Sequence, residues 1–397
     1  MKLNELNIRL HALTVFRSLM EEPVLKALLR YLECRGAEDI QQAVSAYAEF
    51  AAQLYEHGGG NLSAHIRSIV NDNENVYMRL IGEKKQPSAS MQKCVEEEIA
   101  TLQAIAELTE EELRAGLSWE GYLPQFDTEK IDLAKDYRER TGSIAKYGYG
   151  IYARYHMFYI SDDGHIVPVR YPDPVRLSML VDYKREQQII IDNTKALLAG
   201  KPAANMLLTG DAGTGKSSTI KAVVNEFYGE GLRIIQVRKE QLREISAILD
   251  ELTTNPLKFI LFIDDLSFQK DDDNFSALKA VLEGSVSTKS QNVVIYATSN
   301  RRHIVKERFG DREGDDVHCN DTIQEIISLS ERFGLQVTFQ KPNKQTYLDI
   351  VHHLAEEQGI VRDPAEMDML AERFALSRGG RSARAAKQFI DGLLSEE

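Results

Sequence analysis

Gly210-Asp211-Ala212-Gly213-Thr214-Gly215-Lys216-Ser217 is the stretch of this 397-residue chain that decides the fold of its second half. It has the spacing G-x-x-x-x-G-K-[ST], follows the apolar run Asn205–Thr209, and continues through Ser218 into a helical pattern. Its glycines let the backbone curl so that N–H groups point inward, and the helix N-terminus adds a dipole that favours an anion. We therefore expect residues 210–218 to bind phosphate, with Lys216 on the phosphate oxygens and the Ser217 hydroxyl on Mg²⁺.

Strand and helix patterns alternate around this loop from residue 176 onward. The apolar strand candidates are Asn205–Thr209, Arg233–Val237, Phe259–Ile263, Val293–Ala297 and Leu335–Phe339. Strands separated by helices predict a parallel sheet with helices on both faces, which is a three-layer α/β fold. Only helical patterns follow residue 343, and they predict a C-terminal helical lid. The expected domains are therefore residues 1–175, 176–342 and 343–397.

Two carboxylates follow the strand candidate Phe259–Ile263. Because open α/β sheets bind ligands at the carboxyl ends of their strands, we expect Asp264 and Asp265 at the phosphate site. Asp264 would hold the Mg²⁺ shell, usually through water, since this ion prefers hard oxygen ligands. Asp265 would polarise the attacking water. Acidic turns are common, so this prediction depends on the phosphate loop one βα unit upstream.

A third polar strand end follows Val293–Ala297, where the chain reads Thr298-Ser299-Asn300. Asn300 is suited to hydrogen-bond the terminal phosphate or the attacking water. Alternatively, these residues only end the strand and cap the next helix. Because two other candidate strand ends meet at the same edge of the sheet, we prefer the role at the site.

The first 140 residues carry mainly helical patterns and no motif that indicates a chemistry. One helix is expected from about Ser90 to Leu108, with Glu96, Glu97 and Glu98 on its solvated side. Thr109-Glu110-Glu111-Glu112 matches a capping box, which predicts the start of another helix.

Residues 157–172 alternate around Asp163-Gly164, which is a strong signal for a β-hairpin turn. Pro172 and Pro174 then indicate a linker. We therefore expect the first 175 residues to form a mainly helical N-terminal domain that includes a β-hairpin.

The composition excludes several classes of protein. The chain has 43% hydrophobic and 27% charged residues, and 48 Lys and Arg against 61 Asp and Glu give a net charge of -13. Whole-surface nucleic-acid binders are usually basic, so the net charge does not favour nucleic acid as the partner, although a local basic patch is left open. The three cysteines are Cys34, Cys94 and Cys319, and their wide spacing is typical of reduced thiols. No signal peptide or apolar run of about 18 residues is found, so we expect a cytoplasmic location without membrane contact.

Together, the phosphate loop, Asp264-Asp265 and Asn300 resemble the AAA+ class of P-loop NTPases over about residues 176–394. The resemblance implies ATP and ADP as ligands and Mg²⁺ as cofactor. The segment 326–335 is similar to the arginine-finger segment of the replication-initiator and helicase-loader branch. Arg332 would then reach a neighbouring subunit's γ-phosphate, which implies a homo-oligomer, either a ring or a helix.

Two more segments extend this resemblance. Gly379-Gly380-Arg381-Ser382-Ala383-Arg384 is similar to the second sensor of the class, where Arg381 fits best and Arg384 is the competitor. Leu180-Val181-Asp182-Tyr183 is similar to the segment beside adenine, which suggests Tyr183 as a nucleotide contact.

More narrowly, the phosphate loop, Leu282-Glu283-Gly284 and the segments 297–303 and 328–334 resemble a bacterial AAA+ family of unknown function. The resemblance implies an ATPase that hydrolyses ATP to ADP and phosphate, which we expect to drive remodelling of a protein or nucleic acid. The acidic surface and the large helical N-terminal domain favour an unknown protein partner, bound through residues 1–175. One position departs from the class, which usually has Glu where this chain has Asp265. Because Asp is one methylene shorter, a slowly hydrolysing nucleotide-dependent switch, or a protein like a helicase loader, is the alternative.

Overall fold

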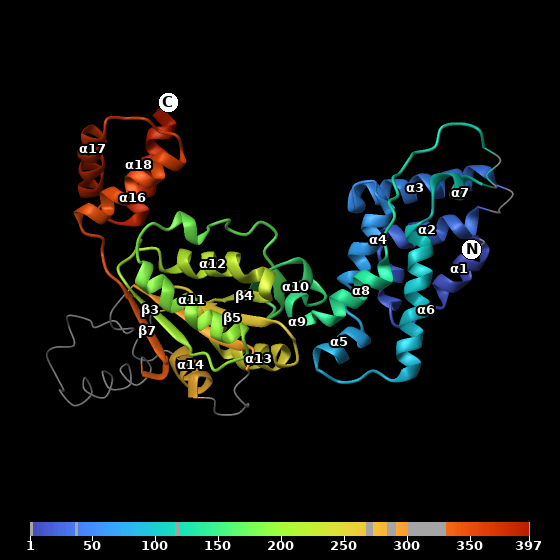
Figure 1. Ribbon diagram of the computed structural model, residues 1–397, viewed down its shortest axis with the longest axis horizontal. Helices are drawn as coiled ribbons and strands as arrows, with labels where there is room; N and C mark the ends of the chain where they lie inside the picture. Colours follow the sequence, from blue (N-terminus) through green and yellow to red (C-terminus); the bar gives the residue numbers. More distant parts are fainter. Residues whose placement is uncertain are drawn as a thin grey trace. The chain divides into compact units, whose positions relative to one another are not determined.

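The computed structural model describes residues 3–35, 39–115, 117, 119–266, 273–283, 291–300 and 331–396. The chain forms two compact units, Met1–Arg154 and Tyr155–Glu397 (Figure 1). Parts of the segments that carry the family resemblance, namely Gly284, residues 301–303 and residues 326–330, lie outside the described residues. Within the described residues, none of the helices combines the length and the apolar character that crossing a membrane requires.

The first unit is helical in its described residues. Its elements are α1 (Leu3–His11), η1 (Arg17–Glu21), α2 (Pro23–Cys34), α3 (Ile40–Gly58), α4 (Leu62–Asn71), α5 (Val76–Gly82), α6 (Ala89–Ala106), α7 (Glu110–Arg114), α8 (Leu133–Gly142), α9 (Ile144–Tyr147) and α10 (Ile151–Arg154). The capping box predicted at the start of α7 is confirmed. Thr109 Oγ1 accepts from the Glu112 amide at 3.2 Å, and Glu112 Oε2 accepts from the Thr109 amide at 3.0 Å.

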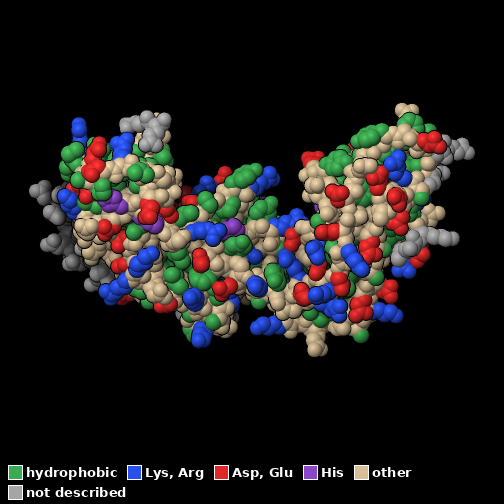
Figure 2. All heavy atoms as spheres, turned by 45° about the horizontal axis from the view of Figure 1, so that its top comes forward, with side chains coloured by type: hydrophobic (Ala, Val, Ile, Leu, Met, Phe, Trp, Pro, Cys, Tyr) green, Lys and Arg blue, Asp and Glu red, His purple; other side chains and the backbone are tan. Residues whose placement is uncertain are grey.

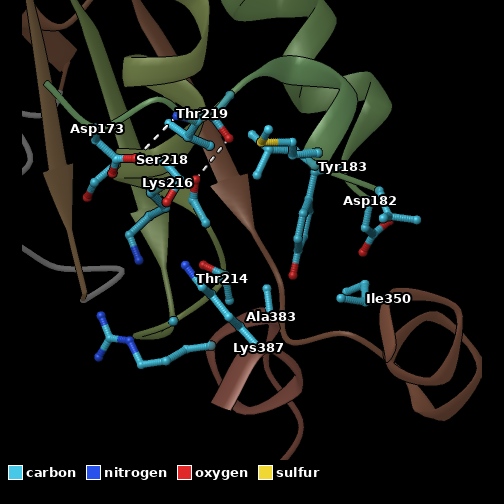
Figure 3. A pocket seen from close by; sticks show the side chains of 18 of the residues that line it. Asp173, Asp182, Tyr183, Thr214, Lys216, Ser218, Thr219, Ile350, Ala383 and Lys387 are labelled. Atoms are coloured by element: carbon cyan, nitrogen blue, oxygen red, sulfur yellow. Dashed lines mark hydrogen bonds between the residues drawn. The ribbon is translucent and has the colours of Figure 1, made fainter. Parts of the chain in front are cut away.

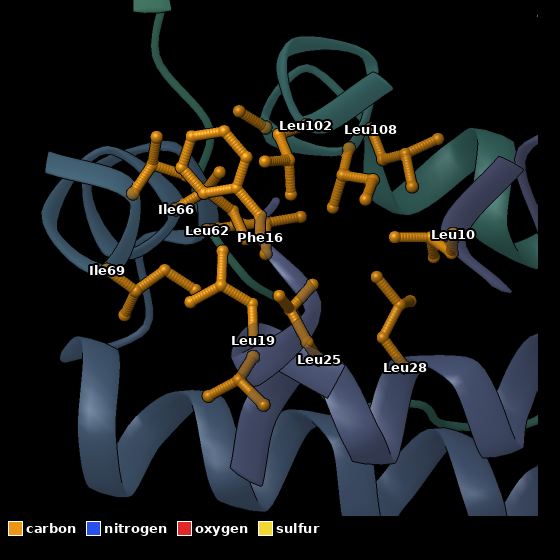
Figure 4. Packing of buried hydrophobic residues seen from close by; sticks show 14 of the residues in the cluster. Leu10, Phe16, Leu19, Leu25, Leu28, Leu62, Ile66, Ile69, Leu102 and Leu108 are labelled. Carbon is orange, nitrogen blue, oxygen red and sulfur yellow. The ribbon is translucent and has the colours of Figure 1, made fainter. Parts of the chain in front are cut away.

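Apolar side chains from the helices of this unit meet in one core (Figure 4). Leu10 of α1, Leu25 of α2, Leu62 of α4 and Leu102 of α6 are all fully buried around Phe16. Each fully buried large apolar side chain contributes on the order of 1.5–3 kcal/mol of transfer free energy. Packing of the helices against one another, more than the propensity of any single helix, therefore holds this unit together.

Glu98 lies in this core, and its predicted place on the solvated side of α6 is wrong. The residue is only 6% exposed. Its carboxylate accepts hydrogen bonds from the backbone amides of Thr14, Val15 and Phe16 at 2.7–3.1 Å. Three successive amides between α1 and η1 have no partner in either helix, and one buried carboxylate satisfies them all.

The second unit contains a seven-stranded sheet in the order β2-β1-β4-β5-β6-β3-β7. The strands are β1 (Met157–Ile160), β2 (Ile166–Pro168), β3 (Met206–Gly210), β4 (Leu232–Val237), β5 (Lys258–Ile263), β6 (Val293–Ser299) and β7 (Leu335–Phe339). All pairs are parallel except β1 with β2. Every residue of β3 and β6 is buried, which requires cover on both faces of the sheet. The predicted three-layer α/β fold is confirmed.

Helices and short turns connect these strands (Figure 1). They are η2 (Leu177–Met179), α11 (Lys184–Leu198), α12 (Lys216–Phe227), η3 (Tyr228–Glu230), η4 (Lys239–Glu244), α13 (Ile245–Thr253) and α14 (Asp273–Glu283). The order of the strands places β5, β6 and β3 side by side. Because these three strands are parallel, their carboxyl ends meet at one edge of the sheet.

The predicted β-hairpin is present, but the structure gives it a different place. Its strands β1 and β2 pair with Phe158 opposite Pro168, and β1 then extends the large sheet by pairing with β4, Met157 opposite Ile234. The sequence pattern predicts the hairpin within the N-terminal domain, with a boundary near residue 175. The boundary between the two compact units instead falls after Arg154, because the buried face of β1 packs with the sheet.

Three helices follow β7 in the described part of the chain. They are α16 (Lys344–Glu357), α17 (Pro364–Ser377) and α18 (Ala383–Glu396). They share a core of their own that includes Tyr347, Val351, Phe389 and Ile390. The Tyr347 hydroxyl donates to the Ala371 carbonyl at 3.0 Å, which joins α16 to α17. We call these three helices the lid.

Candidate functional site

The phosphate loop connects β3 to α12, as the motif predicts. Gly210, Gly213 and Gly215 have φ values of 137°, 80° and 89°, which L side chains rarely adopt. A Cβ on Gly210 would lie 2.0 Å from the Phe339 carbonyl oxygen, so only glycine allows β7 to pack here. Helix α12 begins at Lys216, and its N-terminal amides face the loop, as anion binding requires.

Lys216 is almost completely buried, with 5% of its surface exposed. Its Nζ donates to the carbonyls of Gly210 and Asp211 at 2.9 and 2.8 Å, and to Asn300 Oδ1 at 3.1 Å. Burial lowers the pKa of Lys216 from its ordinary value, while neighbouring carboxylates, Asp211 first among them, act in the opposite direction. A buried ammonium at a strand–helix junction is suited to bind an anion that replaces some of these acceptors.

Ser217 and Asp264 lie next to each other at the ends of α12 and β5. The Ser217 hydroxyl donates to Asp264 Oδ1 at 2.7 Å, and the Thr298 hydroxyl donates to the same oxygen at 2.6 Å. A hydroxyl beside a carboxylate is a donor set that fits Mg²⁺. Among the described residues no group of three or more His, Cys, Asp or Glu could hold a metal.

Asp265 is held in an uncommon conformation next to Asn300. Its φ of 55° lies in the left-handed region, where Asp is tolerated better than most residues. Its amide donates to Thr298 Oγ1 at 3.0 Å, and Asn300 Nδ2 donates to Asp265 Oδ1 at 2.7 Å. The structure therefore brings together the predicted residues Lys216, Asp265 and Asn300.

Thr298 is a residue of this site to which the sequence analysis gave no role of its own. Its hydroxyl contacts Asp264 and the amide of Asp265, and its carbonyl accepts from the Leu266 amide at 2.7 Å. Its side chain therefore holds the carboxylate of Asp264 and the backbone of Asp265. The signal for it was present, because Thr298 is the first polar residue at the end of an apolar strand next to the carboxylates.

A pocket of about 780 Å³ lies over the phosphate loop (Figure 3). Residues 212–219 and the ends of β5 and β6 form one side of it, the segment 179–183 forms another, and the lid contributes Ile350, Leu354, Arg384 and Lys387. Its volume is in the range of cavities that hold small molecules the size of a nucleotide. The pocket therefore combines groups suited to bind phosphate with an apolar part of its wall.

Tyr183 lines this pocket, with φ at 65° just before α11. Its hydroxyl donates to the Gln340 carbonyl at 2.5 Å, and its ring packs against Phe339 with the centroids 4.9 Å apart. Burial raises the pKa of this hydroxyl. The ring is therefore fixed against β7, which gives the pocket a rigid aromatic side.

The two arginines proposed for the second sensor lie in different places. Arg381 donates from Nε and Nη2 to the two carboxylate oxygens of Glu372 on α17, at 2.8 and 2.6 Å, and is not among the residues that line the pocket. Arg384 lines the pocket, and its amide donates to the Gly213 carbonyl at 3.2 Å. The geometry therefore favours Arg384, the competitor, as the lid arginine at the site.

Arg332 lies three residues before β7, where it is partly exposed. It is not among the residues that line the pocket. The expected role of Arg332 at a neighbouring subunit stays a prediction.

Comparison with known proteins gives the family of the chain. A family model described as "Protein of unknown function (DUF815)" matches residues 153–397. The chain belongs to this family. The expected resemblance to a family of unknown function is thereby confirmed, and the DUF815 region begins just before β1 and includes the sheet, the pocket and the lid.

No curated protein matches the chain. Among solved structures, the chain is similar to the Thermotoga maritima RuvB Holliday junction branch migration motor, with 17% identity and a TM-score of 0.36. A variant of that protein gives 16% identity and a TM-score of 0.37. Both matches cover 54% of this chain and 62% of the other. The fold assignment therefore depends on the sheet order and the phosphate loop of this chain.

Proposed function

We propose that this DUF815 protein binds ATP with Mg²⁺ and hydrolyses it to ADP and phosphate. One observation carries the proposal. The buried ammonium of Lys216, the hydroxyl–carboxylate pair of Ser217 and Asp264, and the amide–carboxylate pair of Asn300 and Asp265 all lie at the mouth of one phosphate loop. They line the same pocket, and each has the chemistry that one part of phosphoryl transfer needs.

Each of these side chains has a separate task in the proposed reaction. Lys216 and the loop amides hold the β- and γ-phosphates, and Ser217 and Asp264 would hold Mg²⁺, which when bound supplies positive charge to the phosphate oxygens. Asp265 accepts the proton of a water whose oxygen attacks the γ-phosphorus. The bond from that phosphorus to the bridging oxygen breaks, and ADP leaves with the electron pair. Asn300 orients Asp265 and the water.

The nucleoside is proposed to lie between the segment 179–183 and α16 of the lid. Tyr183, Leu180 and Ile350 supply the apolar contacts on this side of the pocket. Arg384 is the proposed lid contact for phosphate, since Arg381 is already paired with Glu372.

A slowly hydrolysing nucleotide switch is the second candidate, and a specific contact favours it. Asp265 Oδ1 is already bonded to Asn300 Nδ2 at 2.7 Å, and the backbone of Asp265 is in the left-handed region. A base held this way must give up a hydrogen bond, or act through its second oxygen, before it can accept a proton from water. Tight ATP binding with turnover near zero would support the switch.

The remaining parts of the proposal concern assembly, partner and location. We propose a ring or helical homo-oligomer in which Arg332 reaches the γ-phosphate of the neighbouring subunit, where such an arginine is worth roughly 10³–10⁵ in rate. An unknown protein partner would bind the helical N-terminal domain, and the protein would act in the cytoplasm. On the face shown in Figure 2, basic and acidic side chains are interspersed, which does not favour nucleic acid as the partner.

Phosphate release from ATP tests the central proposal. Lys216→Ala should abolish ATP binding and turnover, because it removes the ammonium beneath the phosphates. Lys201→Ala is the matched control, since Lys201 is an exposed lysine in the loop after α11. Unchanged activity of Lys216→Ala would exclude the proposed site. DNA binding measured against salt, with and without ATP, should be negligible if the partner is a protein.

A further inference from the structure

Lys387 lies on α18 and lines the pocket, and neither the motifs nor the family explain it. We propose that Lys387 binds the phosphate chain of the nucleotide and is the second cation, beside Arg384, through which the lid detects bound nucleotide. This inference rests on the proposed function of the pocket and adds a residue and a specificity to it.

The first observation is the position of α18. The amide of Arg384, in the first turn of the helix, donates to the Gly213 carbonyl of the phosphate loop at 3.2 Å. The absence of a side chain at Gly213 allows this approach, because a Cβ there would lie 3.1 Å from Arg384 Cβ. The first turn of α18 is therefore packed directly against the loop that binds phosphate.

The second observation is the direction of the side chain. Lys387 follows Arg384 by three residues, so both lie on the same face of α18. Phe389 and Leu393, on the opposite side of α18, pack in the lid core and fix that side of the helix. Figure 3 shows Lys387 extending from α18 toward Thr214 of the phosphate loop. The ammonium can therefore reach the region where the loop amides converge.

The third observation is that the charge of Lys387 is available. Within the part of the chain that the structure describes, Arg381 forms an ion pair with Glu372 at 2.6 Å, whereas Lys387 forms none. Lys387 is exposed, so little desolvation opposes a contact between its side chain and phosphate. ATP·Mg carries net negative charge. The electrostatic attraction between a lid cation and the nucleotide therefore becomes stronger with each added phosphate group.

Binding affinities along the series adenosine, AMP, ADP and ATP test the proposal by calorimetry. Lys387→Ala should leave adenosine unchanged and weaken ATP binding by about threefold to tenfold, the effect of losing one charged contact, with ADP between them. Arg373→Ala is the matched control, because Arg373 is an exposed lid cation on α17 that does not line the pocket. It should leave all four affinities unchanged.

Two outcomes would overturn the proposal. If Lys387→Ala weakens the binding of adenosine as much as the binding of ATP, Lys387 supports the structure of the lid and does not contact phosphate. If Lys387→Ala changes the affinity for neither adenosine nor ATP, while Lys216→Ala loses ATP binding, the pocket binds nucleotide without a contact to Lys387. Failure of the proposed function would look different, because Lys216→Ala would then keep its affinity for ATP. Thermal unfolding of each variant checks that the lid remains folded.

Discussion

Asn300 and Asp265 share a hydrogen bond of 2.7 Å, in which Asn300 Nδ2 donates to Asp265 Oδ1. The other end of the same amide, Oδ1, accepts from Lys216 Nζ at 3.1 Å. The amide has one good orientation, because a flip would place its NH₂ against the ammonium and its oxygen against the carboxylate. Asn300 therefore links Lys216, the proposed phosphate-binding lysine, to the proposed base Asp265.

Replacing Asn300 tests this link. Asn300→Ala removes the donor to Asp265 and one acceptor of Lys216, and we expect turnover to fall by roughly tenfold to a thousandfold, as when a positioned donor is lost. ATP affinity should change little, since Lys216 keeps two carbonyl acceptors. Phosphate release measured beside equilibrium binding separates the two effects. A parallel loss of both would indicate that Asn300 shapes the pocket and not the reaction.

Asp265→Glu distinguishes the hydrolase from the switch. The longer side chain cannot keep the 2.7 Å bond to Asn300 at the same backbone position, and Glu tolerates the left-handed backbone less well than Asp. A displacement of about 1 Å at a reacting group costs on the order of a hundredfold in rate, so we expect slower turnover. Single-turnover kinetics measure this step. Faster turnover in the variant would show instead that Asp265 limits hydrolysis in the natural protein.

Gly213→Ala should uncouple the lid from the phosphate loop. Gly213 has φ of 80°, and an added Cβ would lie 3.1 Å from Arg384 Cβ and 3.2 Å from Ser382 Oγ. We expect weaker nucleotide binding, because the first turn of α18 must move away. Gly359→Ala provides the control, since Gly359 has φ of 70° but open space around it. Equal effects of the two changes on affinity would mean that backbone strain alone matters.

The arrangement of the candidate phosphate site could be predicted from sequence because its signals are local. The loop motif has fixed spacing, and Asp264 and Asn300 follow apolar strands whose carboxyl ends must meet at one edge of a parallel sheet. The hairpin was also visible, through Asp163-Gly164. The pairing of this hairpin with β4 could not be predicted. Met157 and Ile234 are 77 residues apart, and neither segment carries a signal that identifies the other as its partner.

The directions of some charged side chains also could not be predicted from sequence patterns. Glu98 follows two exposed acidic residues on α6, yet it alone turns inward to the amides of residues 14–16. Arg381 matches the second-sensor motif, but the hydrogen bond to Glu372 holds its side chain against α17. In both cases a tertiary partner outside the motif decides the direction of the side chain, and helical periodicity carries no information about that partner.

Substitutions of Arg381 and Arg384 should affect two different properties, the stability of the fold and the affinity for nucleotide. Arg381→Ala removes the pair with Glu372 and should lower the melting temperature with little change in nucleotide affinity. Arg384→Ala should weaken nucleotide binding and leave the melting temperature nearly unchanged. Thermal unfolding and equilibrium binding of both variants are the measurements. If only Arg381→Ala lowers the affinity for nucleotide, Arg381 is the second sensor, as its motif suggests.

The Arg381 pair also has a predictable pH dependence. The hydrogen bond from Arg381 holds the pKa of Glu372 below its ordinary value of 4.5. A carboxyl whose pKa is lowered by folding stabilises the fold above its unfolded pKa, and that contribution disappears as the pH falls through the folded pKa. The difference in melting temperature between the natural protein and Arg381→Ala should therefore be present at pH 7 and shrink below pH 4.5. A difference that stays constant into acid would exclude the ion pair as its source.

Glu98→Ala should destabilise the N-terminal unit more than any surface change on the same helix. It removes the carboxylate that accepts from the amides of Thr14, Val15 and Phe16. Each buried amide left without an acceptor costs about 1–3 kcal/mol, so we expect a loss of about 3 kcal/mol or more. Trp119, the single tryptophan, lies in this unit, so its fluorescence in urea follows the unfolding of this unit in the full chain.

Glu97→Ala is the control for this change, because Glu97 is the neighbouring residue and its side chain is 67% exposed. Its effect should stay within about 0.5 kcal/mol, as for most surface substitutions. Glu98→Gln should fall between the two, since its amide oxygen still accepts from the backbone while its NH₂ faces donors. If Glu98→Ala costs no more than Glu97→Ala, water satisfies the three amides and the carboxylate is not what fixes the turn between α1 and η1.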